Sequence, residues 1–362
     1  NDPDKQRQKE SGGLTRDVTG AENHTTLLTI APSPLEPEVI WTGSDDGMVH
    51  VTRSGGGAWE EVGERAGDVP EATWVPHIEA SKHTTGVAYV VFDDHRRGNW
   101  EPYIFRAEEY GRRWRRIADE EDLWGFVHVL EEDPATPNLL FAGTEFGLYV
   151  SLNRGEDWFP WTHGIPAVPV RSLVVHPRDQ DLVVGIHGRA IYVIDDIRPL
   201  QVLAEDPTLF SSPLHVFEPP PAYLRSQAAV GGYHFSGDAM FRGETRPPGA
   251  LLTFFAGSPT VGADTVRVEI RTVSGEILRT LRKPVEPGIN RMVWDLREEN
   301  PMDRSSDGER FTPAGVEVLP GTYEVRVALG GREASAKLQV HGDPRVDIPM
   351  SERIEKQRAV RE

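Results

Sequence analysis

The stretch from Gly143 to Trp158 reads GTEFGLYVSLNRGEDW and carries the pattern on which much of the chain is built. An apolar run, 139–142, enters this stretch, Gly147 interrupts it, and a second apolar run, 148–150, follows. Two short apolar runs separated by a glycine-containing turn predict two antiparallel strands. The remaining residues, 151–158, read S-x-N-x-G-x-x-W and predict a second turn with a signature of its own.

This arrangement recurs along the chain. Residues 26–62, 77–117 and 127–161 each hold four short apolar segments separated by turn residues, and a fourth unit begins at Ser172 and stops after its third strand. Tryptophans 59, 114 and 158 end the equivalent turns and lie 55 and 44 residues apart. Four short strands per unit of this length predict β-propeller blades, which must stack on one another to bury their faces.

The sequence predicts fewer complete blades than a closed propeller needs. A closed propeller needs about four to eight blades, and the sequence supplies three whole blades and most of a fourth. Either further blades lie outside this sequence or the blades form an open arc, and we favour the first alternative because the chain begins at Asn1 and not at a methionine.

The region after the blades predicts a second all-β domain. Period-two alternation, as in Val266-x-Val268-x-Ile270, and turns such as Pro320-Gly321 indicate about seven short strands, which suggests an immunoglobulin-like sandwich. The expected order is a polar N-terminal loop (1–22), propeller blades (23–200), a proline-rich linker (201–245), the sandwich (246–341) and a charged tail (342–362) that begins a further segment. The expected fold class is therefore all-β, an incomplete propeller followed by a sandwich.

Composition excludes several classes of partner and cofactor. The net charge of −18 argues against nucleic acid or an anionic membrane as the main partner. The absence of cysteine excludes disulfides, thiol nucleophiles and cysteine-ligated metals. No apolar run approaches the ~20 residues of a membrane span. The 12 histidines show no metal-ligand spacing and no nucleotide-binding motif occurs, so we expect neither a metal nor a cofactor.

The repeated turn resembles the Asp box, S-x-D-x-G-x-x-W, of sialidase-type and sortilin-type β-propellers. The Asp position holds Ser54, Glu109 and Asn153 in the three copies, and Ala107 stands at the hydroxyl position of the second. We expect these turns to be structural, with polar side chains bonding turn amides and the tryptophan packing into the blade. The residues to which we assign this structural role are Trp59, Gly111, Trp114, Ser151, Asn153, Gly155 and Trp158.

A wider resemblance covers about residues 20–345. The segments 31–34 (APSP), 102–105 (PYIF), 143–147 (GTEFG) and 188–196 (GRAIYVIDD) resemble large bacterial proteins identified as BNR-repeat glycosyl hydrolases or sortilin-N-terminal-like proteins. Residues 273–281 and 288–295, together with 320–323 (PGTY), are similar to the Ig-like domain of flagellar hook-capping proteins. The resemblance implies an extracytoplasmic protein of which this chain is the C-terminal part. The hydrolase name itself rests on fold analogy.

Functional residues are expected on the propeller face opposite the Asp boxes. The turns between the second and third strands of each blade should meet there, near the central channel. The carboxylates that could form a glycosidase acid/base pair, which needs a separation of ~5 to 9.5 Å, are Asp45, Asp46 and Glu145. The residues expected to bind ligand are Asp94, His95, Arg96, Trp100, Trp124, Phe146, His187 and Arg189.

Three functions remain open from the sequence. The first is binding of a glycan or polypeptide on this rim. In this case the missing blades of the same protein are a second expected partner of the chain. The second is a glycoside hydrolase that uses the rim carboxylates, and the third is a scaffold. A sialidase site would need three arginines from separate blades, of which only Arg96 and Arg189 can be nominated.

Overall fold

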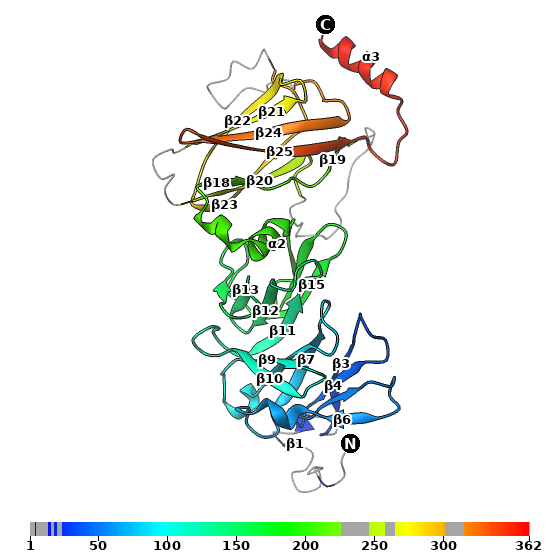
Figure 1. Ribbon diagram of the computed structural model, residues 1–362, viewed down its shortest axis with the longest axis vertical. Helices are drawn as coiled ribbons and strands as arrows, with labels where there is room; N and C mark the ends of the chain where they lie inside the picture. Colours follow the sequence, from blue (N-terminus) through cyan, green and yellow to red (C-terminus); the bar gives the residue numbers. More distant parts are fainter. Residues whose placement is uncertain are drawn as a thin grey trace. The chain divides into compact units, whose positions relative to one another are not determined.

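The structure is a computed structural model that describes residue 4, residues 14–15 and 18–19, and the ranges 24–225, 246–257, 265–300 and 315–361. The chain forms two compact units, Asn1–Pro207 and Thr208–Glu362. Both are built from mainly antiparallel sheets with a few short helices (Figure 1), which confirms the predicted all-β fold class. Among the described residues, no helix is long and apolar enough to span a lipid bilayer.

In its described residues, the first unit contains three four-stranded sheets and one three-stranded sheet, each an antiparallel meander. Blade 1 comprises β3 (Leu27–Pro32), β4 (Ile40–Ser44), β5 (Val49–Thr52) and β6 (Trp59–Glu61). Blade 2 comprises β7 (Trp74–Ala80), β8 (Ala88–Asp93), β9 (Tyr103–Glu108) and β10 (Arg113–Ala118). Blade 3 comprises β11 (Val127–Glu132), β12 (Leu140–Thr144), β13 (Gly147–Ser151) and β14 (Phe159–Pro160). Blade 4 comprises β15 (Val170–His176), β16 (Asp181–Ile186) and β17 (Ile191–Ile194).

The described part of this unit also contains smaller elements. They are the hairpin of β1 (Leu14–Thr15) and β2 (Val18–Thr19), and the 3-10 turns η2 (Gly63–Ala66) and η3 (His95–Arg97).

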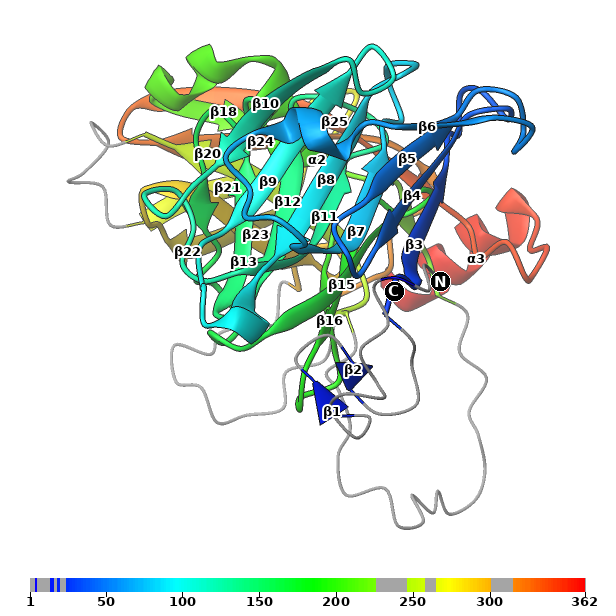
Figure 2. The ribbon, with the colours of Figure 1, turned by 90° about the horizontal axis from the view of Figure 1, so that it is seen from below.

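The blades stack in the manner of a propeller. The first strands of successive blades, β3, β7, β11 and β15, contact one another in sequence and lie beside one another in Figure 2. Apolar side chains fill the spaces between the sheets, as in the cluster of Tyr89, Leu130 and Leu140 that joins blades 2 and 3. Stacking is needed because a single four-stranded sheet leaves an apolar face in water.

Every first strand is interrupted at the same place. Its pairing register with the second strand shifts between Leu27 and Thr29, Trp74 and His77, Val127 and Val129, and Val170 and Ser172. A bulge of this kind lifts one or two residues out of the alternation between the two faces of the sheet. The bulges place Leu28, Val75 with Pro76, His128 and Arg171 near the second-to-third turns.

The third copy of the repeated turn, residues 151–158, is held by its own side chains and by the preceding blade. The backbone N–H of Gly155 donates to Ser151 Oγ at 2.7 Å, and the N–H of Asp157 donates to Asn153 Oδ1 at 2.9 Å. The indole Nε1–H of Trp158 donates to the carbonyl of Ile117 in blade 2 at 2.8 Å. A Cβ at Gly155 would come within 3.0 Å of the Ile117 side chain, so this turn seats closely on blade 2.

The other two copies of the turn differ in their tryptophans. Trp114 is half-buried beside the rings of Phe92 and Phe105, with centroids 6.3 Å away in both cases. Trp59 is 45% exposed, although its turn keeps a hydrogen bond from the N–H of Gly56 to Thr52 Oγ1 at 3.0 Å. The expectation that each tryptophan packs into its blade is therefore not met by Trp59, which has no described blade on its side of blade 1.

Part of the expected linker belongs to the two units. Helix α2 (Arg198–Glu205) follows blade 4, and its Leu200 and Ala204 join the core between blades 3 and 4. Gln201 Nε2 donates to Asp133 Oδ2 at 2.9 Å, which fixes the helix on blade 3. The 3-10 segment η4 (Pro207–Ser211) comes next, while β18 (Leu214–Val216) and β19 (Ala222–Tyr223) are strands of the second unit. Residues 226–245 lie outside the described part.

The second unit is a β-sandwich. One sheet has the order β18–β20–β23, with β20 at Ala250–Ala256 and β23 at Gly288–Trp294. The other has the order β19–β25–β24–β21–β22, with β21 at Thr265–Thr272, β22 at Ile277–Pro284, β24 at Gly321–Leu329 and β25 at Arg332–His341.

The core of the sandwich is apolar and centred on Trp294, which is fully buried. The hydroxyl of Tyr323 donates to the carbonyl of Leu319 at 2.6 Å, the kind of bond made by a tyrosine corner. Helix α3 (Met350–Arg361) lies in the segment expected as a charged tail. The immunoglobulin-like topology stays a prediction.

Candidate ligand-binding site

The blade 1 carboxylates stabilise their own turn. Asp45 is 4% exposed; one of its oxygens accepts a hydrogen bond from the N–H of Thr26 at 2.8 Å, and the other lies 3.7 Å from His24 Nδ1. Asp46 Oδ1 accepts from Ser44 Oγ at 2.5 Å, and Asp46 borders a hollow of about 570 Å³ beside the β6–β7 loop. These contacts tie both candidate catalytic acids to blade 1, and no described hydrogen bond or ion pair joins either of them to Glu145.

The charged residues between Asp93 and Pro102, at the end of β8 and in the β8–β9 loop, mostly contact one another. His95 Nδ1 lies 2.7 Å from Asp93 Oδ1, and Asp94 forms an ion pair with Arg97. Arg97 also donates to Thr73 Oγ1 at 2.9 Å and so ties the loop to the segment before β7. The guanidinium of Arg96 lies over the ring of Trp74, 3.2 Å from its centroid. The predicted ligand-binding charges of blade 2 are therefore engaged within the protein.

Ionisable side chains of blades 3 and 4 meet in one place. Glu145 Oε2 lies 2.9 Å from His128 Nε2 and 3.5 Å from Arg171 Nη2, and Arg171 Nη1 lies 3.2 Å from His128 Nδ1. His128 and Arg171 are residues of the two strand bulges. Burial lowers the pKa of His128 below its ordinary value.

The blade 4 candidates do not join this cluster. His187 and Arg189 are exposed, and their side chains form no ion pair with any residue in the part of the chain that the structure describes. The backbone N–H of His187 donates to the carbonyl of Pro169 at 2.9 Å, so the turn itself is anchored.

The predicted aromatic residues do come together. Trp124 and Phe146 stack with centroids 4.3 Å apart and planes 20° apart, and Phe146 and Trp100 lie 6.1 Å apart, also at 20°. Phe126 lies edge-on to Trp100 at 5.3 Å and stacks on His95 at 4.3 Å. We call Trp100, Phe146 and Trp124 the aromatic shelf. Its rings come from the β8–β9 loop, the β12–β13 turn and the β10–β11 loop.

The shelf borders a hollow of about 650 Å³ and is open to solvent. Trp100 is 49% exposed and Trp124 66%, which is unusual for side chains of this size. The residues that line the hollow are Gly98, Asn99, Trp100, Glu101, Pro102, Glu120, Leu123, Trp124, Gly125 and Phe146. The hollow therefore has one apolar wall of three rings and a rim that contains carboxylates.

Two polar side chains beside the shelf, Asn99 and Glu101, already have partners. Asn99 Nδ2 donates to Tyr103 Oη at 3.0 Å, and Asn99 Oδ1 accepts from the N–H of Glu101. Glu101 accepts from Tyr103 Oη at 2.9 Å and from Arg116 Nη2 at 2.6 Å. The hydrogen bond from Arg116 lowers the pKa of Glu101, which keeps this carboxylate ionised.

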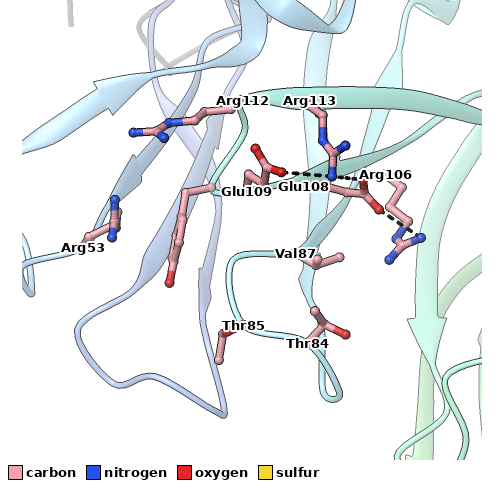
Figure 3. Close-up of a pocket in the computed structure, with 10 residues that line it drawn as sticks. Arg53, Thr84, Thr85, Val87, Arg106, Glu108, Glu109, Arg112 and Arg113 are labelled. Atoms are coloured by element: carbon pink, nitrogen blue, oxygen red, sulfur yellow. Dashed lines mark ion pairs between the residues drawn. The ribbon is translucent and has the colours of Figure 1, made fainter.

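A second hollow, of about 420 Å³, lies on the Asp-box side between blades 1 and 2 (Figure 3). Arg113 pairs with Glu109 at 3.0 Å, and Arg106 pairs with Glu108 at 3.1 Å. Arg53 stacks over Tyr110 at 4.1 Å, and the Tyr110 hydroxyl donates to Glu36 at 2.9 Å. Most charges in this hollow are balanced internally, so we do not place the candidate site there. Within the described ranges, no group of three or more His, Asp or Glu side chains is arranged to hold a metal ion.

Sequence reasoning missed Phe126, His128, Arg171 and Glu120. All four belong to first strands or to the loop that precedes β11, whereas most of the expected site residues lie in second-to-third turns. A polar residue inside an apolar strand, as in Val127-His128-Val129, is the signal that could have found His128.

Comparisons with known proteins find similar folds and no family. No protein-family model matches the chain, and no curated protein matches it. A structure of YCF48 bound to D1 peptide is 16% identical with a TM-score of 0.35, over 47% of this chain and 51% of that one. A GH74 xyloglucanase from Xanthomonas campestris is 18% identical with a TM-score of 0.39, over 52% of this chain and 31% of that one. The extracellular domain of BT3049 from B. thetaiotaomicron is 12% identical with a TM-score of 0.36, over 88% of this chain and 38% of that one.

Proposed function

We propose that the protein binds an extended polypeptide on the propeller rim and that the aromatic shelf makes the principal contact. The observation that carries the proposal is the set of three nearly parallel rings beside an open hollow, two of them tryptophans that are 49% and 66% exposed. Exposed apolar surface of this kind marks sites of interaction. Each aromatic contact contributes about 0.5–1.5 kcal/mol beyond the burial of its area.

A polypeptide fits these surroundings better than a glycan does. Sugar hydroxyls need directional hydrogen bonds from polar groups beside the stacking ring. Here Asn99 and Glu101 already bond to Tyr103 and Arg116. Side chains of a polypeptide can instead stack on the rings while its backbone remains solvated.

The hydrolase alternative receives less support from the same residues. A glycosidase needs two carboxylates, of which the acid must hold its proton through a raised pKa. The pKa of Glu101, the carboxylate beside Trp100, is lowered by its hydrogen bond from Arg116. Glu145 is held by His128 and Arg171.

Two further parts of the proposal rest on the resemblance described above. We place the protein outside the cytoplasm, and we assign the exposed apolar faces of blades 1 and 4 to packing against further blades of the same protein. The second assignment is supported by Ile30 and Ile191, which are 64% and 67% exposed on the two outer sheets.

A selection experiment tests the proposed function. A random peptide library is selected on the wild-type protein, and a panel of polysaccharides is tested for retention in parallel. We expect selected peptides to lose about tenfold or more in affinity for Trp124→Ala, with a similar loss for Trp100→Ala, because each change removes a stacking ring. Trp59→Ala removes an exposed tryptophan of blade 1 and serves as the matched control.

The outcomes separate the candidate functions. Peptides that bind equally well to the Trp100 and Trp124 variants would overturn the proposal. Retention of a polysaccharide that is lost in the same two variants would assign the rim to glycans. Hydrolysis of a polysaccharide that Glu145→Gln abolishes would assign it to catalysis.

A further inference from the structure

We infer that the polypeptide taken by the aromatic shelf is basic, and that arginine or lysine side chains stack on its rings while carboxylates of the β10–β11 loop neutralise them. This inference rests on the proposed function and specifies the chemistry of the partner.

The hollow beside the aromatic shelf is lined by acidic and not by basic side chains. Its ten lining residues include two carboxylates, Glu101 and Glu120, and no Lys, Arg or His. A cation next to an aromatic face is attracted by the ring quadrupole, and nearby carboxylates strengthen this attraction. Glu101 is paired with Arg116, whereas Glu120 has no ion pair within the described residues, so an anionic ligand would meet an uncompensated negative charge here.

The loop that presents Trp124 adds more negative charge. Residues 119–122 read Asp-Glu-Glu-Asp, directly before Leu123 and Trp124. Asp122 Oδ2 accepts from the N–H of Asp119 at 3.2 Å, and Asp119 Oδ1 accepts from the N–H of Glu121 at 2.8 Å, so the outer acids fix the turn. Glu120 and Glu121 are exposed, and within the described chain no ion pair involves any of these four acids.

Three arginines of blades 2 to 4 do not cancel this charge, because each is paired with an acid outside residues 119–122. Arg116 pairs with Glu101 at 2.6 Å, Arg97 pairs with Asp94, and Arg171 lies 3.5 Å from Glu145. The net charge of −18 also favours the approach of a cation from solution. The carboxylates of residues 119–122 therefore leave this end of the rim with uncompensated negative charge.

The same region already stacks arginine on aromatic rings. The guanidinium of Arg116 lies 4.7 Å from the ring centroid of Tyr103, and that of Arg96 lies 3.2 Å from the centroid of Trp74. Arginine is well suited to this geometry because its planar guanidinium is weakly hydrated. The outer faces of Trp100 and Trp124 offer the same kind of surface to an arginine from another chain.

A pair of peptides that differ only in charge tests the inference. One is a labelled, unstructured peptide of glycine, serine and several arginines, and its counterpart carries citrulline, which has nearly the same shape and no charge. Fluorescence anisotropy at low salt is expected to show at least about tenfold tighter binding of the arginine peptide. Trp124→Ala should weaken the binding of the arginine peptide by a similar factor.

Charge-neutralising variants locate the effect. Glu120→Gln/Glu121→Gln should weaken binding of the arginine peptide by about threefold to tenfold, as expected for solvent-exposed ion pairs with some screening. Glu352→Gln/Glu355→Gln removes the same charge from exposed positions of α3 and should leave the affinity unchanged. An equal loss in both double variants would overturn the inference, because it would show only the effect of net charge.

The results also separate this inference from the proposed function. If the two peptides bind equally and both depend on Trp124, the site binds polypeptide and the inference about charge is wrong. If neither the arginine peptide nor any library peptide binds, both are wrong. Binding of glucosamine oligomers, with no binding of the arginine peptide, would contradict the choice of a polypeptide.

Discussion

His128 can form both of its hydrogen bonds only as a neutral ring. Arg171 Nη1 must donate to His128 Nδ1, so the proton of the imidazole lies on Nε2, from which it is donated to Glu145. Burial, which lowers the pKa of His128, favours the same neutral form. The cluster therefore holds the β12–β13 turn, and with it Phe146, in one position at neutral pH.

Glu79 is a buried acid at the opposite end of the blades, and burial raises its pKa where it lowers that of His128. Glu79 at the end of β7 forms an ion pair with Lys82, and Lys82 also donates from Nζ to the carbonyl of Glu132 in blade 3 at 2.8 Å. Burial nevertheless raises the pKa of Glu79 to about 7, and the neighbouring Glu131 contributes to the rise. This group links blades 2 and 3 and titrates near neutral pH.

The stability of the blades should fall as the pH rises through the window of Glu79. The unfolded chain releases this proton near the ordinary pKa of 4.5, whereas the folded protein holds it up to about 7. Between these values the unfolded state binds fewer protons, so the free energy of unfolding decreases with increasing pH. Glu79→Gln removes this proton and should flatten the dependence of the melting temperature on pH between pH 4.5 and pH 7.

The control is Glu60→Gln, which changes a half-exposed carboxylate of blade 1. It should keep the wild-type dependence on pH. Buried histidines such as His77, whose pKa is lowered, have the opposite effect on this dependence, so the difference between variant and wild type is the informative quantity. An unchanged slope in Glu79→Gln would contradict the assignment.

Residues of the site differ in how far the sequence could predict them. The proximity of Trp100, Trp124 and Phe146 could be predicted, because the loops at the same end of neighbouring blades lie close together for any loop sequence. Asp45 could not be assigned correctly, since its bond with the N–H of Thr26 depends on where the preceding strand begins. His128 was hidden because a bulge changes the face to which a strand residue belongs.

At the level of elements, the β10–β11 loop positions the shelf through Gly125. Its φ is +78°, and a Cβ there would lie 2.5 Å from Phe146 Cδ2. Gly125→Ala should therefore displace Phe146 from its stacking position against Trp124 and weaken ligand binding by about tenfold, in addition to a backbone cost of about 1–2 kcal/mol. A binding assay measures the loss of ligand affinity. Thermal unfolding followed by near-ultraviolet circular dichroism measures the loss of stability.

Gly98 provides a matched control in the same hollow. Its φ is +83°, and a Cβ there would have no heavy atom within 4 Å. Gly98→Ala should show a similar loss of stability and keep the ligand affinity. Equal affinity in the two alanine variants would show that the position of Phe146 does not matter for binding.

The strands were predictable from local pattern, whereas the segment after them was not. Four apolar runs per unit give four strands because each run is short and bounded by turn residues. The proline-rich composition of the segment around residues 198–221 does not predict α2 or β18. Both elements are stabilised by contacts with residues that are distant in the sequence. The pairing of Leu214 with Ala256 is one such contact.

At the scale of the molecule, the series of four described blades has an apolar outer sheet face at each end. Val174, Val183 and Val193 pair across the outer face of blade 4 in one row, and Val174 and Val193 are each 53% exposed. On blade 1, Leu27 is 54% exposed. Apolar surface of this kind in water favours association.

The isolated chain should therefore associate with itself through blade 4. Ile191→Thr/Val193→Thr keeps β-branched side chains and lowers their apolar area, so the dissociation constant should rise by about tenfold, given about 0.8 kcal/mol for each buried methylene-sized group. Analytical ultracentrifugation over a range of concentrations measures this. Val273→Thr, at an 81% exposed position of the sandwich, is the control. A wild-type chain that stays monomeric at high concentration would contradict the prediction.

The bulges in the first strands have a consequence for how new binding properties could arise. A residue that stands outside the pairing register can be exchanged while every core residue keeps its face. The four blades already carry different side chains there, from Leu28 to His128 and Arg171. Exchanging the exposed residues Leu28 and Arg171 would vary the surface chemistry near the second-to-third turns, whereas Val75 of blade 2 is fully buried in the core and has to be kept. These two positions are therefore starting points for engineered receptors.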